Sequence, residues 1–357
     1  MTRLVGVLGG AGAVGRTAVE RLRGFGLPVR VGGRDLARAG EVARAHAAEA
    51  VMVDLFDDAS LAAFCAGCSV VLNCAGPSYQ VLDRVARAAL EAGAGYVDAA
   101  GDLVAADALA QNPPAALARH PAVFSAGLMP GLSGLLPRLL LDGSPVARLD
   151  VYVGGSVEIS AASAVDALLT RGPKFGHALA MWRDGRVAPH SLAPLRSITL
   201  PGFRGRVHAV PFLSTEMIGL ASAAGLTELR NYTVYATDNL PQAFATAWAD
   251  EGQPPEAHAD AIVDAAQRDV AAHGRHYAVL AYARPRVGSG LMPRRVLLRT
   301  PDSYPLSGVV SAVAARQVAL GSVIPGAHFA SEVLDPEAVA KELAADPLVS
   351  ELALPSR

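Results

Sequence analysis

The sequence predicts an α/β protein, in which a doubly wound parallel sheet forms one domain and an inserted α+β segment forms a second. Three observations support this class. The chain has 357 residues, more than twice the length of a typical domain. Short apolar strands alternate with amphipathic helices over roughly the first 128 residues. A glycine-rich turn joins the first strand to the first helix.

Composition excludes several classes of protein. Hydrophobic residues make up 52% and charged residues 18%, so the chain is neither disordered nor collagen-like. The 31 basic and 33 acidic residues nearly cancel, which leaves no basic field for nucleic acid or an anionic membrane. The first apolar run, Leu4–Leu8, is too short for a signal peptide, and we find no clean membrane span. We therefore expect a small-molecule substrate.

The three cysteines, Cys65, Cys68 and Cys74, lie within ten residues of one another. An odd, clustered set is not a disulfide framework and indicates a reducing cytoplasm. Cys65 and Cys68 have the spacing of a redox pair or of half a zinc site. Because no second cysteine pair or spaced histidine pair completes a metal site, we interpret them as packing residues and expect no metal.

The first strand runs into Gly9-Gly10-Ala11-Gly12-Ala13-Val14-Gly15, and a helical pattern follows over Arg16–Arg23. Three of these glycines form the motif G-x-G-x-x-G. The first permits a tight turn, the second lets a pyrophosphate approach the backbone, and the third lets helix and strand pack closely. The phosphates would lie at the helix N-terminus. The predicted dinucleotide contacts are Gly10, Gly12, Ala13, Val14 and Gly15.

The second strand, Val29–Gly33, indicates which dinucleotide is bound. An NAD-binding fold places an acidic residue about 20 residues beyond the glycine motif, where it binds the ribose 2′-hydroxyl. Here that position is Gly33, followed by Arg34. Glycine leaves room for a 2′-phosphate and arginine can pair with it, so we predict NADP. Asp35 has another explanation, as the N-cap of a helix over residues 36–48.

Four further strands are predicted at residues 51–54, 70–74, 96–98 and 123–125, with helices at 60–65 and 81–92 between them. Ligands bind outside the carboxyl ends of the strands in such a sheet. The residues at these ends therefore complete the predicted cofactor contacts: Asp54, Cys74, Ala75, Gly76, Pro77, Asp98, Gly127, Pro130 and Gly131. Asp54 has two interpretations, since it either meets adenine or caps the turn that follows.

Five pieces of the chain resemble the saccharopine dehydrogenase-like, NADP-binding oxidoreductases. They are Gly9–Gly15, Val31–Asp35, Asn73–Pro77, Tyr96–Asp98 and Ala126–Gly131, and the segment Ile324–Leu334 looks like the tail of bacterial members. The resemblance implies a Rossmann domain interrupted by an inserted α+β domain. It also implies NADP as the cofactor and hydride exchange at a carbon bonded to nitrogen. It does not fix the substrate.

The middle of the chain has the pattern of one α+β domain. We expect strands at residues 149–154, 197–200, 276–282 and 295–299, a hairpin across 178–187, and helices at 163–169 and 256–272. Helices at 306–320 and 336–345 should return to the first domain. The predicted boundaries are therefore residues 1–130 plus about 305–357 for the Rossmann domain and about 131–304 for the insertion.

We expect the active site between the domains, above the ends of the fourth to sixth strands. Topology places Tyr79 and Asp102 there, and either could supply the proton that an imine nitrogen needs for hydride attack. Their alternative roles are a packed tyrosine and a helix-capping aspartate.

The inserted domain offers a basic, glycine-containing loop at residues 171–177. Lys174 is our third catalytic candidate, and Arg171 and His177 are candidate substrate contacts, because cations can hold a carboxylate. A solvated loop is the alternative. His328 is a further substrate candidate.

Together these observations predict a cytoplasmic NADP-dependent oxidoreductase. We expect imine reduction or opine-type reductive amination of a small amino-acid-derived or specialised metabolite. One alternative is a reductase of enoyl or carrier-bound intermediates, and another is a non-catalytic NADP-binding sensor or scaffold. Two macromolecular partners are possible on this reading of the sequence. One is a second copy of the chain, forming a homodimer, and the other is a carrier protein that bears the substrate.

Overall fold

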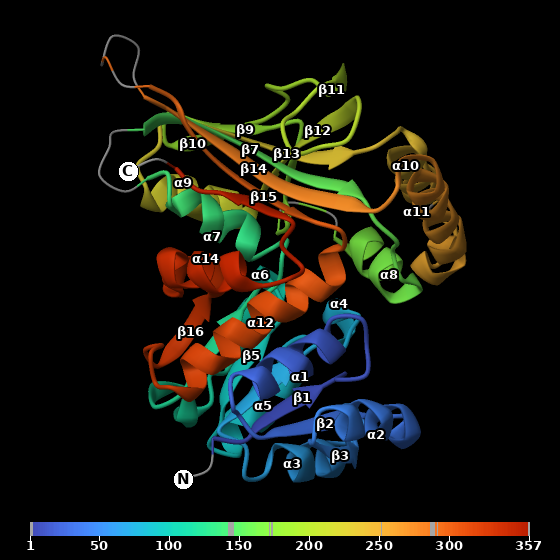
Figure 1. Cartoon of the computed structure of the whole chain (residues 1–357), viewed down its shortest axis with the longest axis vertical. Helices are drawn as coiled ribbons and strands as arrows, with labels where there is room; N and C mark the ends of the chain where they lie inside the picture. Colours follow the sequence, from blue (N-terminus) through green and yellow to red (C-terminus); the bar gives the residue numbers. More distant parts are fainter. Residues whose placement is uncertain are drawn as a thin grey trace. The chain divides into compact units, whose positions relative to one another are not determined.

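The computed structural model describes residues 3–141, 146–170, 172, 174–250, 252–285, 290 and 292–355. The chain divides into two compact units (Figure 1). Unit 1 comprises Met1–Leu132 and Tyr304–Asp335, and unit 2 comprises Ser133–Ser303 and Pro336–Arg357.

Unit 1 is built on a parallel seven-stranded sheet in the order β16-β6-β5-β4-β1-β2-β3. Its strands are β1 (Val5–Leu8), β2 (Val29–Gly33), β3 (Glu49–Met52), β4 (Val70–Asn73), β5 (Gly95–Asp98), β6 (Pro121–Phe124) and β16 (Gly326–Phe329). Its helices are α1 (Gly15–Gly24), α2 (Leu36–Ala45), α3 (Asp58–Cys65), α4 (Ser78–Val81), α5 (Arg84–Glu91), α6 (Leu103–Gln111), η1 (Ala115–Ala118), α12 (Ser303–Ala319) and α13 (Ala330–Val333). This architecture confirms the predicted doubly wound α/β sheet.

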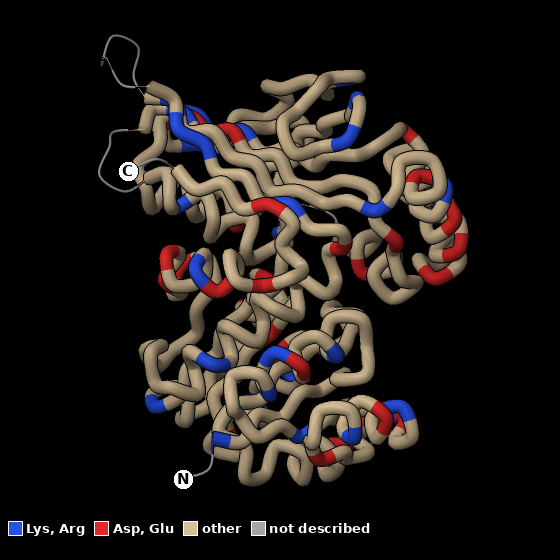
Figure 2. Tube along the Cα trace, viewed as in Figure 1, with Lys and Arg blue, Asp and Glu red and all other residues tan. Residues whose placement is uncertain are grey.

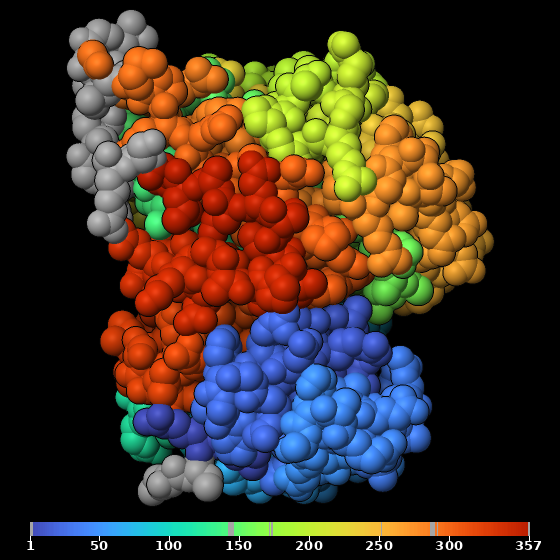
Figure 3. Space-filling view, in the orientation of Figure 1, coloured from blue at the N-terminus to red at the C-terminus, as the bar shows by residue number. Residues whose placement is uncertain are grey.

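The central strands are apolar because helices bury them. Every residue of β1, β4 and β5 is buried. Helices α3, α5 and α6 share one core, in which Phe64, Tyr96 and Phe124 are fully covered. Helix α12 packs against the start of α1, and Figure 3 shows orange and blue surfaces in contact. At this contact a Cβ on Gly308 would lie only 2.4 Å from the Val14 carbonyl oxygen.

Several details of unit 1 differ from the sequence prediction. Strand β3 spans Glu49–Met52 rather than residues 51–54. The helix predicted over residues 81–92 is α5, which begins only at Arg84. The separate short helix α4 ends at Val81, because Leu82 adopts φ 48° and ψ −127°, which no helix allows. A seventh strand, β16, pairs in parallel with β6 and comes from the segment that resembles a family tail.

Unit 2 contains a mixed ten-stranded sheet in which β10-β9-β13-β7-β14-β15-β17 form the main path and β12 joins β13, β11 and β8. Its strands are β7 (Val146–Ser156), β8 (Gly176–Ala178), β9 (Met181–Arg183), β10 (Arg186–Ala188), β11 (Leu195–Ile198), β12 (Val207–Ser214), β13 (Glu228–Tyr235), β14 (His276–Pro285), β15 (Arg294–Thr300) and β17 (Glu351–Ala353). Its helices are α7 (Leu132–Arg138), α8 (Ala161–Leu169), α9 (Thr215–Ala223), α10 (Asn239–Ala249), η2 (Pro255–His258), α11 (Ala259–His273) and α14 (Pro336–Ala345).

The end of the chain corrects one predicted boundary. The sequence suggests that everything from about residue 305 completes the first domain, but residues 336–357 group with unit 2. The physical reason is strand pairing. Strand β17 runs antiparallel to β15, with Leu298 opposite Leu352, and so extends the sheet of unit 2. Helix α14, which leads into β17, therefore groups with the same unit.

Charged residues of both signs are interspersed along the trace in Figure 2, and acidic residues recur on α11. Within the described ranges, no helix is long and apolar enough to cross a membrane.

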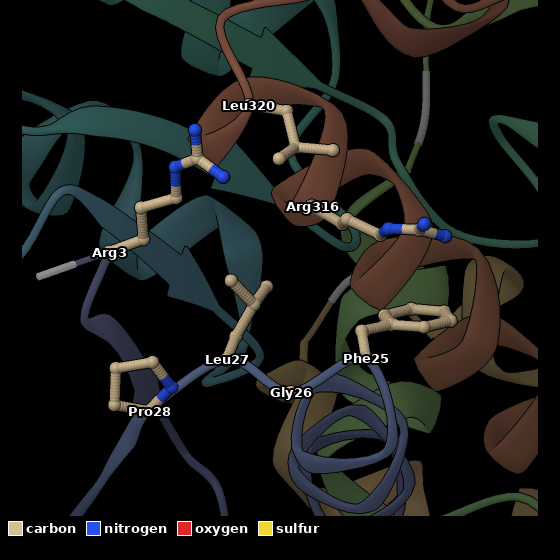
Figure 4. Close-up of a pocket in the computed structure, with 7 residues that line it drawn as sticks. All are labelled: Arg3, Phe25, Gly26, Leu27, Pro28, Arg316 and Leu320. Atoms are coloured by element: carbon tan, nitrogen blue, oxygen red, sulfur yellow. The ribbon is translucent and has the colours of Figure 1, made fainter.

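A cavity of about 460 Å³ lies at the amino ends of β1 and β2 (Figure 4). Its lining includes Arg3, Leu27 and Leu320, and the Arg316 guanidinium lies over the Phe25 ring at 4.6 Å. Dinucleotides bind at the opposite, carboxyl edge of such a sheet, so this cavity is not the expected cofactor site.

Candidate active site

The turn between β1 and α1 has no room for a side chain at two of its motif glycines, Gly10 and Gly15. A Cβ on Gly10 would lie 2.8 Å from Val31 Cγ1, and one on Gly15 would lie 2.3 Å from the Gly9 oxygen. Val14, at the N-cap of α1, provides no side-chain hydrogen bond, and the first turn holds no acidic residue. A helix N-terminus in this state favours an anion, because its first N–H groups and dipole point outward. The turn therefore fits a pyrophosphate.

The end of β2 has both features that a 2′-phosphate requires. A Cβ on Gly33 would meet nothing within 4 Å, so this position is open. Arg34 is exposed and forms no ion pair with any residue that the structure describes. Asp35 is the N-cap of α2, as predicted, since its Oδ1 accepts hydrogen bonds from the Ala37 and Arg38 N–H groups at 3.0 and 3.1 Å. Arg34 is thus the charged side chain that faces solvent beside the open glycine.

The residues after β3 have a structural role. Asp54 Oδ1 accepts a hydrogen bond from the Phe56 N–H at 2.9 Å, and the Asp54 N–H donates to Ser60 Oγ at 3.1 Å. Of the two interpretations of Asp54, the structure shows the cap.

At the carboxyl edge of β4 and β5, two predicted catalytic residues meet. Tyr79 Oη donates a hydrogen bond to Asp102 Oδ2 at 2.8 Å, from α4 and from the N-cap of α6 respectively. Asp102 Oδ1 also accepts from the Val104 N–H, so the residue caps α6 as well. Burial raises the pKa of the Asp102 carboxyl, although the hydrogen bond from Tyr79 opposes this. A carboxyl with a raised pKa beside a phenol can hold and pass a proton.

Asp98 and Cys74 are both predicted cofactor contacts. Asp98 is 2% exposed, and its carboxylate accepts hydrogen bonds from the Ala100 and Gly101 N–H groups, so the side chain lies inside unit 1 and does not face a cofactor. Cys74 is partly exposed, and its N–H donates to the Leu8 oxygen at the end of β1. Its contact with the cofactor stays a prediction.

The loop after β6 is closed by its glycines. A Cβ on Gly127 would lie 2.3 Å from the Ala99 oxygen. Gly131 has φ +126° and would place a Cβ 2.3 Å from the Ser125 oxygen. These positions bring the loop against the end of β5, while Pro130 between them is partly exposed. The loop thus borders the same edge of the sheet as Tyr79.

The family of this unit follows from comparison with known proteins. Residues 5–128 match the family model of the saccharopine dehydrogenase NADP binding domain. The match confirms the NADP cofactor predicted from the sequence and, over the NADP-binding domain, the resemblance to this family; it supports an NADP-dependent oxidoreductase. No curated protein sequence matches the chain.

Solved structures show the same fold over both units. Apo histidine-tagged saccharopine dehydrogenase (L-Glu forming) from Saccharomyces cerevisiae matches with a TM-score of 0.68 and 14% identity, covering 97% of this chain and 98% of that one. A myo-inositol dehydrogenase from Corynebacterium glutamicum matches with a TM-score of 0.46 and 10% identity, covering 90% of each chain. At these identities the first likeness concerns the fold alone, and the second carries no argument.

The remaining candidates come from unit 2 and from strand β16 of unit 1. Lys174 is exposed, and His177 is half-buried in β8 of unit 2, while Arg171 falls outside the described residues. His328 lies in β16, where its Nε2 contacts the Ile324 and Pro325 oxygens at 3.2 Å. These contacts occupy one ring nitrogen of the partly exposed side chain, and its role as a substrate contact stays a prediction.

Several residues at the edge of the NADP-binding domain have roles that sequence reasoning missed. Gly9 has φ +73°, and a Cβ there would lie 2.9 Å from the Ala75 N atom, so it lets the first turn meet the turn after β4. Asn73, Tyr96 and Ser125 form hydrogen bonds within the same edge. A polar residue inside an otherwise apolar strand was the available signal for Asn73 and Tyr96.

The cysteine pair is part of the core. Cys65 and Cys68 are free and buried, and burial raises the pKa of Cys65 to about 12. Thiols in this state are inert packing groups. Among the residues that the structure describes, no group of three or more His, Cys, Asp or Glu could hold a metal ion.

Proposed function

We propose that this oxidoreductase reduces a C=N bond, as an imine reductase or in opine-type reductive amination of a small amino-acid-derived or specialised metabolite. NADPH, when bound, supplies the hydride. The chain must then bind the substrate and deliver one proton to its nitrogen.

The observation that carries this proposal is the hydrogen bond from Tyr79 to Asp102. In the reductive direction Asp102 is protonated and this hydrogen bond is reversed, so that the carboxyl gives its proton to Tyr79 Oη while the Tyr79 proton passes to the imine nitrogen. Asp102 is left ionised and is reprotonated by solvent. Burial raises the pKa of Asp102 and so favours the protonated form that this relay requires.

The charge of the pair favours an imine over an enoyl substrate. A protonated imine is a cation, and an ionised Asp102 beside it would be stabilising. Hydride addition to an enoyl group instead develops an enolate anion, which the same carboxylate would repel. The pair therefore supports C=N reduction over the enoyl alternative.

The residues at the edge of the sheet offer the groups that NADP binding requires. The motif residues Gly10, Gly12, Ala13, Val14 and Gly15 would hold the pyrophosphate, and Arg34 would pair with the 2′-phosphate. The turn of Ala75, Gly76 and Pro77, with the loop that contains Gly127, Pro130 and Gly131, would border the nicotinamide.

The test is a substrate panel with two readouts. NADPH oxidation would be followed with mixtures of keto acids or aldehydes and amines, and with enoyl substrates, both free and carrier-linked, as a matched set. NADPH binding would be measured in parallel by thermal shift. We expect oxidation with amine–carbonyl mixtures and none with either component alone. Oxidation by enoyl substrates only would contradict the proposal, and tight binding without turnover would indicate a sensor.

In unit 2 we propose Lys174 and His177 as contacts for a substrate carboxylate, and we propose a cytoplasmic homodimer as the working form. Lys174→Gln should raise KM for a carboxylate substrate and leave NADPH binding unchanged. Light scattering at several concentrations tests the dimer. A monomer at all concentrations would argue against it.

A further inference from the structure

Asp98 is a buried carboxylate that no cation neutralises within the described part of the chain. It accepts hydrogen bonds from Tyr96 Oη, from Asn73 Nδ2 at 3.4 Å, from the Ala100 N–H at 2.9 Å and from the Gly101 N–H at 2.7 Å. Burying a charge is unfavourable unless its acceptors are satisfied. Here four neutral donors, from two strands and one turn, satisfy the acceptors of the carboxylate. A residue that served packing alone would not need such a set of donors.

The donors are themselves connected to the turns at the carboxyl edge. Asn73 Oδ1 accepts from the Ala75 N–H at 3.0 Å, which fixes the start of the turn after β4. The Gly101 oxygen accepts from Ser125, through its N–H at 2.7 Å and its Oγ at 2.9 Å. One continuous network therefore joins the ends of β4, β5 and β6.

The carboxylate also shapes the segment that leads into Asp102. A Cβ on Gly101 would lie 2.6 Å from Asp98 Oδ2, so the backbone of this segment rests directly on the carboxylate. Asp102 follows immediately, and its Oδ2 accepts from Tyr79. A shift of the Asp98 side chain would therefore move the backbone that carries Asp102.

We propose that Asp98, held by Tyr96 and Asn73, is a positioning residue, which aligns the turns after β4, β5 and β6 and so orients the Tyr79–Asp102 pair. This inference rests on the proposed function for its kinetic test. It assigns Asp98 no contact with substrate or cofactor.

The charge of Asp98 gives this role a distinctive readout. Burial is the main cause that raises the pKa of Asp102, and the negative charge of Asp98 adds to it. Tyr79 and Asp98 are the titratable groups that act on Asp102. If imine reduction needs protonated Asp102, the rate falls as pH rises through its pKa. Removing the Asp98 charge should move this fall to lower pH.

The experiment uses the full chain with Asp98→Asn and Tyr96→Phe. We expect Asp98→Asn to lower kcat for imine reduction about tenfold or more and to move the alkaline fall to lower pH. Tyr96→Phe keeps the charge, so we expect a loss of about three- to tenfold in kcat with the fall unmoved. In both variants KM should change little. Tyr232→Phe, a similarly buried tyrosine in unit 2, is the matched control and should keep wild-type rates.

A second measurement separates this inference from the proposed function. The Asp102 carboxyl would be titrated by ¹³C NMR, and amide exchange would be followed at Ala75, Ala100 and Gly101. We expect a lower Asp102 pKa in Asp98→Asn and faster exchange at these amides in Tyr96→Phe, even if no imine substrate is found. If both variants only melt earlier, with the Asp102 titration, the exchange and any pH profile as in wild type, Asp98 is merely structural and the inference is overturned.

Discussion

The preference for NADP over NAD should depend mainly on Arg34, an exposed side chain beside the open position at Gly33. We expect Arg34→Ala to weaken NADPH binding by about 1–3 kcal/mol, as for the loss of a charge-assisted hydrogen bond, and to leave NADH binding nearly unchanged. Titration of the nicotinamide fluorescence of each cofactor gives the two constants. Arg44→Ala, which removes an exposed arginine from the other end of α2, is the control. Equal losses for both cofactors would reject the 2′-phosphate assignment.

Tyr79 and Asp102 should have separable kinetic effects. Tyr79→Phe removes the relay and should lower kcat by about 10²-fold or more, with little change in NADPH affinity. Asp102→Asn should abolish the alkaline fall in the rate of imine reduction, because the group whose raised pKa sets it is gone. The sign follows from protonated Asp102 being the active form. A fall that persists unchanged in Asp102→Asn would show that another group supplies the proton.

At the residue scale, local motifs were predictable and long-range hydrogen bonds were not. The glycine turn and the Asp35 cap are encoded in a few consecutive residues, so their spacing indicates the structure. The rule that ligands bind at the carboxyl ends of parallel strands placed Tyr79 and Asp102 at one edge of the sheet, and their side chains do form a hydrogen bond there. The inward direction of Asp98 depends on Asn73, which is 25 positions away, and no local pattern reveals it.

At the scale of elements, the contact between α12 and α1 determines how the nucleotide turn is held. A Cβ on Gly308 would lie 2.4 Å from the Val14 oxygen and 2.9 Å from Thr17 Cβ. We expect Gly308→Ala to lower the free energy of unfolding by about 1–3 kcal/mol through overpacking, and to weaken NADPH binding because Val14 is displaced. Chemical denaturation and cofactor titration measure the two effects.

The control for Gly308→Ala is the same substitution where space exists. Gly24 ends α1, and a Cβ there would meet nothing within 4 Å. Gly24→Ala should leave cofactor binding intact and be neutral or stabilising by up to about 1 kcal/mol. If both variants behave alike, the close approach at Gly308 does not hold the turn.

Elements were predictable where the chain alternates regularly and were missed where tertiary pairing decides. The central strands of unit 1 are continuous apolar runs, which indicate burial on both faces. By contrast, β12 contains Pro211, and β13 pairs in parallel with β7, a strand distant in sequence. Strand β16 is only four residues long and exists because β6 offers it an edge. Such strands are fixed by their partners more than by their own sequence.

At the scale of the whole chain, the same dependence explains why the domain count was predictable and the last boundary was not. Length and the glycine motif indicate two domains, one of them nucleotide-binding. The position of residues 336–357 depends on β17 finding β15, a contact about 50 residues away that leaves no local pattern. Unit 2 is therefore built from two separate segments of the chain, Ser133–Ser303 and Pro336–Arg357. Its stability should be measured separately from that of unit 1.

His276 gives unit 2 a stability that depends on pH. The residue is 3% exposed, and its Nδ1 lies 3.1 Å from the Gly274 oxygen. Burial is the main cause that lowers the imidazole pKa. The hydrogen bond with the Gly274 oxygen opposes it, and the nearby charges of Arg204, His273 and Arg299 add to the lowering. The folded unit therefore binds fewer protons than the unfolded chain near pH 6. The stability contributed by neutral His276 is present above the ordinary pKa of 6.5 and is lost as pH falls.

We expect the unfolding midpoint of unit 2 to drop between pH 7.5 and 5.5 in the wild type and to drop less in His276→Leu, which cannot be protonated. Because β7 and β14 lie in the sheet of unit 2, amide exchange over these strands should report on unit 2 specifically. His190→Gln, which removes an exposed histidine, should retain the wild-type dependence. If His276→Leu loses as much stability on acidification as the wild type, other buried groups of the second sheet must control its response to acid.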